Sequence, residues 1–177
     1  MYQAMKIPRI EYRKILYATD LSEAGRTAFP YAASIAHRYD AELTVFHVVK
    51  PPEFEDYLVG YIDEDMWREI KTRDLEEVKS ILVSRKRDDV SIKNKVDQFC
   101  QSTLADCEDN PYVVYEVKVD MGDPVQEIVK EARDGAYDLV VIGKRGRGLL
   151  EEAVMGTTAR RVLRRCDQSV LVVPLLE

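Results

Sequence analysis

The sequence predicts an α/β fold: a single-domain, three-layer sandwich in which helices cover both faces of a parallel sheet. Short apolar runs rich in β-branched residues alternate along the chain with segments in which apolar residues recur at helical spacing. The 177 residues, 46% of them apolar and 33% charged, suit one soluble domain with a sizeable core. A glycine-rich, cationic segment between a predicted strand and a predicted helix indicates a ligand site beyond the carboxyl ends of the strands.

The first half of the chain predicts two buried strands around one helix. The apolar run Lys14–Thr19 is the first strand, and Ser22 is placed to cap a helix that continues to about Tyr39. The continuous β-branched run Glu42–Val49 predicts a second strand that is buried on both faces. Pro51 and Pro52 end it, because proline cannot donate to a strand ladder.

A long helical insert is predicted between the second and third strands, over residues 61–110. It contains neither glycine nor proline, and its apolar residues recur with helical periodicity. One unbroken helix of this length would span roughly 75 Å at 1.5 Å per residue. We therefore expect a break near Arg87–Asp89, giving two helices or a protruding hairpin. The insert could form a dimer contact or a partner surface, or it could be a solvated cover for the sheet.

The second half of the chain predicts three further strands. Tyr112–Val119 alternates at its end, as an edge strand does. Asp123 and Pro124 are typical of a helix start, and Leu139–Ile142 reads as a buried strand. The last strand, Ser169–Val173, follows a helix that carries four arginines, which we interpret as a solvated face.

Composition excludes several classes of partner. The net charge of −6 argues against a surface built for nucleic acid, and no apolar run approaches the roughly 20 residues of a membrane span. Because the N-terminus lacks an apolar signal core, we expect a cytoplasmic protein.

The cysteines and histidines predict no metal site and no disulfide framework. Cys100 and Cys107 would share a helix face as two small buried side chains, and Cys166 stands apart. A zinc site needs more ligands, and the two histidines lie far off in sequence. His47 is interpreted as a satisfied core histidine and His37 as a cation at a helix end.

The segment Gly143–Thr157, GKRGRGLLEEAVMGT, predicts an anion site. Glycine lets backbone amides approach phosphate oxygens, and the free amides and dipole of a helix that opens at Gly156 favour an anion. The cations that would attract it are Lys144, Arg145 and Arg147. A plain turn is the alternative for a glycine-rich loop. The patterns of the Walker A loop and of GxGxxG dinucleotide binders are both absent.

The spacing Gly143-x2-Gly146-x9-Gly156-Thr157 is similar to the G-x2-G-x9-G-[S/T] motif of the universal stress protein family, in its nucleotide-binding branch. The resemblance runs from about Tyr12 to Pro174 and includes the stretches KILYATDLSEAG, VFHVV, GDPVQEIV and SVLVVP. It implies one universal stress protein domain over residues 1–177, with a Rossmann-like sheet of five parallel strands in the order 3-2-1-4-5. It also implies a homodimer through the last strand.

The resemblance further implies that the ligand is ATP or another adenine nucleotide, with Mg²⁺ or Mn²⁺ as an option through the phosphates. Thr19 and Asp20 would hold the nucleoside, and the backbone of Val48 would meet the adenine edge. Asp20 could instead cap the first helix, although Ser22 can fill that role. The expected nucleotide-binding residues include the cations of this segment. They are Thr19, Asp20, Val48, Ile142, Gly143, Lys144, Arg145, Gly146, Arg147, Gly156, Thr157 and Thr158.

The function expected from the sequence is that of an ATP-binding, nucleotide-dependent regulatory protein of the stress response. One alternative is a slow ATPase, although Asp20 is the one clear candidate for a water-activating base and no catalytic residue is assigned. The other is a nucleotide-free dimeric interaction module that acts through the helical insert on an unknown protein partner. Two departures from the family pattern are Lys144-Arg145, which makes the loop more cationic, and the length of the insert.

Overall fold

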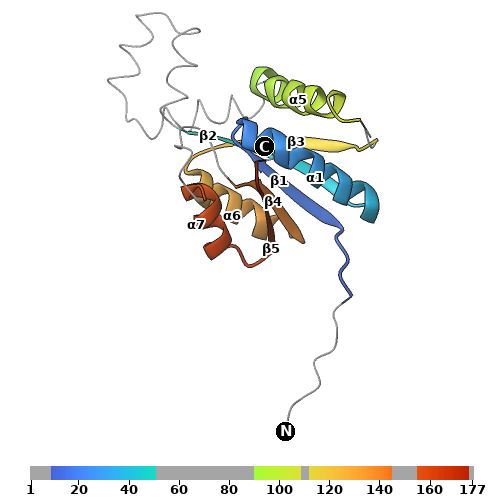
Figure 1. The fold of residues 1–177 in the computed structure, drawn as a ribbon. Helices are drawn as coiled ribbons and strands as arrows, with labels where there is room; N and C mark the ends of the chain where they lie inside the picture. The colour runs from blue at the N-terminus through green and yellow to red at the C-terminus, as the bar shows by residue number, and fades with distance from the viewer. Residues whose placement is uncertain (1–8, 51–89, 109–111, 145–154, 176–177) are drawn as a thin grey trace, which may run out of the picture.

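The computed structural model describes residues 9–50, 90–108, 112–144 and 155–175. They form a five-stranded parallel sheet in the order β3-β2-β1-β4-β5, with helices on both faces (Figure 1), which confirms the predicted fold class. The strands are β1 Lys14–Thr19, β2 Glu42–Val49, β3 Tyr115–Met121, β4 Leu139–Gly143 and β5 Ser169–Val173. The helices are α1 Glu23–Tyr39, α5 Val90–Ala105, α6 Pro124–Asp134 and α7 Thr157–Arg165.

Strand β1 lies at the centre of the sheet and separates two apolar layers. Ile15 and Tyr17 face the layer beneath α1 and α5, whereas Leu16 and Ala18 face the layer beneath α6 and α7. All four side chains are buried, as expected for a parallel strand that is covered on both faces. Burial raises the pKa of the Tyr17 phenol, whose hydroxyl donates to the Gly25 carbonyl at 2.6 Å and so ties β1 to α1.

The predicted helix starts are confirmed, and one strand boundary is corrected. Ser22 caps α1, and the Asp123 side chain accepts from the first turn of α6, where Pro124 is the first helical residue. Strand β3 is an edge strand, as predicted, but it spans Tyr115–Met121 rather than Tyr112–Val119. Its pairing with β2 begins at Tyr115, so the preceding apolar residues have no strand beside them.

The described half of the insert is a cover for the sheet. Helix α5 packs on α1 and β3, and Ile92, Val96 and Cys100 belong to the core layer. Deleting this helix would therefore open the core layer. The predicted break at residues 87–89 and the rest of the insert before Val90 lie outside the described residues.

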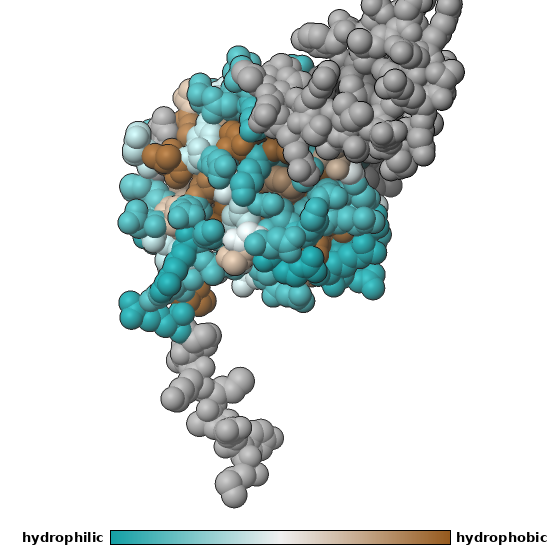
Figure 2. All heavy atoms as spheres, turned by 180° about the vertical axis from the view of Figure 1, so that it is seen from behind, coloured by the Kyte–Doolittle hydropathy of each residue, from teal (hydrophilic) through white to brown (hydrophobic). Residues whose placement is uncertain are grey.

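The surface seen from behind the view of Figure 1 is largely hydrophilic, with hydrophobic residues gathered in small areas (Figure 2). Among the described residues, no helix is long and apolar enough to cross a membrane.

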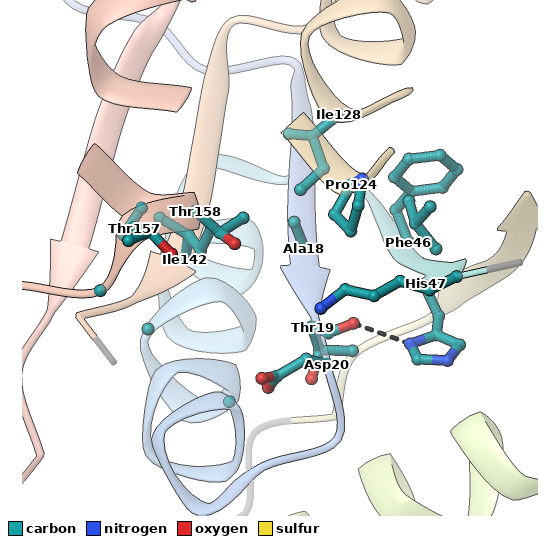
Figure 3. A pocket seen from close by; sticks show the side chains of 16 residues that line it. Ala18, Thr19, Asp20, Phe46, His47, Pro124, Ile128, Ile142, Thr157 and Thr158 are labelled. Carbon is teal, nitrogen blue, oxygen red and sulfur yellow. Dashed lines mark hydrogen bonds between the residues drawn. The ribbon is translucent and has the colours of Figure 1, made fainter. Parts of the chain in front are cut away.

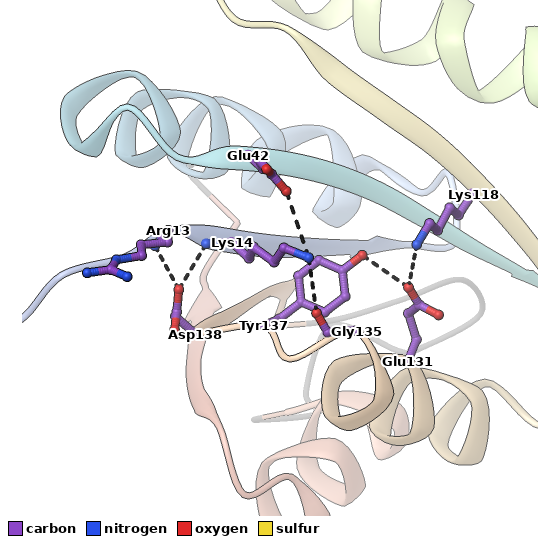
Figure 4. A network of polar contacts seen from close by, with 8 residues as sticks. All are labelled: Arg13, Lys14, Glu42, Lys118, Glu131, Gly135, Tyr137 and Asp138. Atoms are coloured by element: carbon purple, nitrogen blue, oxygen red, sulfur yellow. Dashed lines mark hydrogen bonds and ion pairs between the residues drawn. The ribbon is translucent and has the colours of Figure 1, made fainter.

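Polar contacts join the elements at the edge of the sheet where the strands begin (Figure 4). The Asp138 carboxylate, just before β4, accepts from the backbone amides of Arg13 at 2.7 Å and Lys14 at 2.9 Å. The Asp138 amide in turn donates to the Lys14 carbonyl at 2.9 Å. One residue thus sets the register between β1 and β4 at the point where both strands start.

A second contact in Figure 4 joins α6 to β3. The Glu131 carboxylate accepts from Lys118 Nζ and from the Tyr137 hydroxyl, both at 3.0 Å. The hydrogen bond to Glu131 raises the pKa of the Lys118 ammonium. Lys118 and Glu131 are partly exposed. Exposed ion pairs stabilise a fold by at most roughly 1 kcal/mol, and we expect this pair to contribute well under that to the free energy of unfolding.

Removing the Asp138 carboxylate should weaken the start of the sheet. We expect Asp138→Ala to lower the free energy of unfolding by about 1 kcal/mol, because two amides lose a shared acceptor that is exposed to solvent. Asp138→Asn keeps one carbonyl oxygen and should lose less. Urea unfolding followed by circular dichroism measures both, and an unchanged midpoint for Asp138→Ala would contradict this account.

The cysteines should differ in reactivity. Cys100 is buried, which raises the pKa of its thiol to about 12. Cys107 was predicted to be buried on the same helix face, but it lies beyond the end of α5 and is half-buried, as is Cys166. Because the thiolate is the reactive form, a thiol reagent at pH 8 should modify two cysteines in the native protein and the third after unfolding. Fast modification of Cys100 in the native state would show that its thiol is accessible to solvent and would contradict this prediction.

Candidate functional site

A cavity of about 190 Å³ opens at the edge of the sheet where the strands end (Figure 3). Its walls come from the ends of β1, β2 and β4 and from the first residues of α6 and α7. Strand β1 lies between β2 and β4, so the connections on its two sides diverge here, and a crevice forms between them. In Figure 3, Thr157 and Thr158 lie on one side, Phe46 and Pro124 on the other, and Asp20 between them.

Eight of the residues predicted from the sequence line this one cavity. They are Thr19, Asp20, Val48, Ile142, Gly143, Gly156, Thr157 and Thr158. Lys144 is not among the lining residues. Its backbone donates to Val173 at 2.7 Å and accepts from Gly156 at 2.8 Å, which joins β4, β5 and the start of α7. Arg145, Gly146 and Arg147 lie outside the described residues.

The turn after β1 holds Asp20 in a defined orientation. The Asp20 carboxylate accepts from the Ser22 amide at 3.0 Å, and Thr19 Oγ1 accepts from the Leu21 amide at 3.0 Å. Ser22 caps α1 by accepting from the Gly25 amide at 3.3 Å, so Asp20 is not the helix cap. The carboxylate is therefore anchored in the cavity wall by the amide of a residue two positions along the chain.

The two described glycines of the motif serve different purposes. A Cβ on Gly143 would lie 2.5 Å from the Ala24 carbonyl oxygen, so glycine at this position lets the end of β4 approach α1. Gly156 precedes α7 with φ −63° and ψ 150°, an extended conformation that any residue can adopt. It is buried and lines the cavity, so a side chain at this position would compete with a ligand for space.

The start of α7 gives the cavity a positive pole. The N-cap residue of this nine-residue helix is Gly156, which has no side chain to cap it, and Thr157, Thr158 and Ala159 at its first turn line the cavity. Amides in the first turn have no carbonyl partner within their own helix, and the helix dipole adds partial positive charge. The helix carries its four arginines on an exposed face, as predicted; they are Arg160, Arg161, Arg164 and Arg165.

Several lining residues were missed from the sequence. His47 is buried as predicted, with its ring nitrogen Nδ1 2.8 Å from the Thr19 carbonyl, but it also borders the cavity. Lys50 and Pro124 directly follow β2 and the turn after β3, so the rule that found Asp20 could have found them. Phe46 and Ile128 had no such signal, because they are ordinary core positions of their elements.

The described part of the chain contains no group of three or more His, Cys, Asp or Glu side chains that could hold a metal ion. The cavity offers three kinds of contact. It combines an apolar wall, a fixed carboxylate and a helix N-terminus within one hollow.

A methyl group at Gly143 should disturb packing rather than ligand contacts. We expect Gly143→Ala to lower the free energy of unfolding by about 1–3 kcal/mol, because the added carbon would meet the backbone of α1. Thermal unfolding without any ligand is the relevant measurement. Unchanged stability would mean that α1 moves away at little cost and that Gly143 is not needed for packing.

Known proteins resemble this chain over most of its length. The model of the universal stress protein family matches residues 11–174. Universal stress protein MJ0577 of Methanocaldococcus jannaschii is 29% identical, with 93% of this chain and 96% of that protein covered. The solved structure of MJ0577 superposes with a TM-score of 0.63 at 25% identity, covering 95% of this chain and 99% of the other.

More distant structures share the fold. A universal stress protein solved in complex with cAMP has a TM-score of 0.58 at 18% identity, covering 94% of this chain and all of the other. The Arabidopsis thaliana family protein At3g01520, solved with AMP bound, has a TM-score of 0.51 at 15% identity, with 92% and 91% covered. With the family model matching residues 11–174 on this five-stranded sheet, the chain belongs to the universal stress protein family.

Proposed function

We propose that this protein binds an adenine nucleotide, ATP in the first instance, and acts in the cytoplasm as a nucleotide-dependent regulatory protein. The observation that carries the proposal is the arrangement within one cavity of an apolar wall, the Asp20 carboxylate and the N-terminus of α7. These are the three features that a base, a ribose and a phosphate chain require, in the order in which a nucleotide presents them.

The base would lie against the apolar wall formed by Phe46, Pro124 and Ile128, with the Val48 backbone at its edge. The ribose hydroxyls would donate to Asp20, whose orientation is fixed by the Ser22 amide. Apolar surface with a few placed polar groups is typical of small-molecule sites.

The phosphates would accept from the amides at the start of α7 and from the Thr157 hydroxyl, since a helix N-terminus favours an anion. Lys144, Arg145 and Arg147, with Gly146, would complete this side of the site as the sequence predicts. Mg²⁺ or Mn²⁺ would enter as a partner of the phosphates.

The relatives solved with cAMP and with AMP supply the choice of probes for this chain. A fair test compares ATP, ADP, AMP and cAMP, each with and without Mg²⁺. We propose no catalytic residue, because the Asp20 carboxylate is engaged at the turn that it helps to form. Release of phosphate from ATP in the same samples would reveal a slow ATPase.

Isothermal titration should show ATP binding in the micromolar range, which corresponds to about −8 kcal/mol. Gly156→Val should weaken binding at least tenfold, because a branched side chain would occupy the space at the start of α7. Asp20→Asn keeps an oxygen for the Ser22 amide but loses the charge, so its affinity should also fall. Arg165→Gln, at the exposed far end of α7, is the control and should bind as the wild type does.

Two results would contradict the proposal. One is a wild-type protein that binds none of the four nucleotides. The other is a folded Gly156→Val protein with unchanged affinity, which would move the ligand away from α7.

We further propose a homodimer that forms through the open edge of β5. This strand pairs with β4 on one side, and Val170, Leu171 and Val172 remain partly exposed. Light scattering after size exclusion should give twice the chain mass of 20.4 kDa. Val170→Lys should shift the protein toward the monomer, because a charge on an edge strand opposes pairing. A wild-type monomer at all concentrations would exclude this dimer.

A further inference from the structure

The His47 side chain has a definite hydrogen-bonding role in the cavity wall. It lies on β2, where its register partners are Thr19 on β1 and Val119 on β3, and it is 8% exposed. Its Nδ1 is 2.8 Å from the Thr19 carbonyl oxygen (Figure 3). A carbonyl oxygen can only accept, so Nδ1 carries the proton in this contact. The bond is available to the neutral and the protonated ring alike.

The carbonyl that His47 holds belongs to the peptide group joining Thr19 to Asp20. Two residues after Thr19, Leu21 has φ 59°, in the left-handed region that residues other than glycine rarely adopt. Such a conformation costs free energy and persists where the surrounding contacts impose it. Here Thr19 Oγ1 accepts from the Leu21 amide and Asp20 Oδ1 from the Ser22 amide.

His47 also stands beside the second element of the proposed site. The next residue, Val48, lines the cavity, and in the proposed function its backbone meets the base. The ring therefore joins the strand that would hold the base to the turn that would hold the ribose.

We propose that His47 is a positioning residue of the ligand site. By donating Nδ1–H to the Thr19 carbonyl, it holds the strained turn in the geometry that presents the Asp20 carboxylate to the ligand. Its effect on affinity therefore passes through Asp20. This inference rests on the proposed nucleotide binding and assigns His47 no contact with the ligand.

The first test compares two substitutions by titration with ATP. His47→Leu removes the donor and should weaken binding about tenfold or more, the equivalent of one hydrogen bond of about 1.4 kcal/mol. In His47→Asn, the amide nitrogen can take the place of Nδ1, so affinity should return to within about threefold of the wild type. Val45→Ala, a buried change on the same strand away from the cavity, should lose stability and keep its affinity.

A double-mutant cycle decides whether the effect passes through Asp20. In an Asp20→Ala background, His47→Leu should cause little further loss, because the group that it positions is gone. Additive losses would mean that the ring contacts the ligand itself, and the inference would be wrong. Equal affinity of His47→Leu and wild type would overturn it too.

The failure of this inference differs from the failure of the proposed function. If the wild type binds ATP and Gly156→Val does not, while His47→Leu binds normally, only the role of His47 falls. If the wild type binds no nucleotide, both fall. Nitrogen NMR of histidine-labelled protein without ligand gives an independent measurement: Nδ1 should carry the proton, and an unprotonated Nδ1 would overturn the inference.

Discussion

The structure depends on the burial of β1 on both faces at the centre of a parallel sheet. Its side chains alternate between two apolar layers, so neither layer can form without it. The strand also has a neighbour on each side, and those neighbours lead to different faces of the sheet. The crevice at its carboxyl end is a direct consequence, because the connections that leave there must separate.

The same constraint explains why short-range contacts gather at this end. The chain must turn from a buried strand into α1 within three residues, and it does so with Leu21 in a left-handed conformation. Side chains of Thr19, Asp20 and His47 hold that turn through backbone groups. Gly143 allows the end of β4 to approach α1 on the other side. Close packing and the geometry of the cavity are thus two outcomes of one arrangement.

The charge around the cavity differs from the overall charge of the protein. The protein carries a net charge of −6, yet the start of α7 brings partial positive charge to the wall of the cavity through its first-turn amides and its helix dipole. The Asp20 carboxylate lies between that wall and the side formed by Phe46 and Pro124 (Figure 3). Charges of both signs therefore border one hollow.

The sequence alone determined the order of elements, the helix caps and the place of the cavity, because these depend on local periodicity and on residues adjacent in the chain. Ser22, Asp123 and Pro124 act within one helical turn, and the eight predicted lining residues lie at or just past the ends of strands or open a helix. The tertiary structure decided what depends on neighbours distant in sequence. Strand β3 begins where β2 can pair with it, and Gly143 is needed because the end of β4 lies close to α1. The described helix of the insert packs into the core. His47 belongs to the same group, since its partner lies 28 residues away and only the parallel pairing of two strands brings them together.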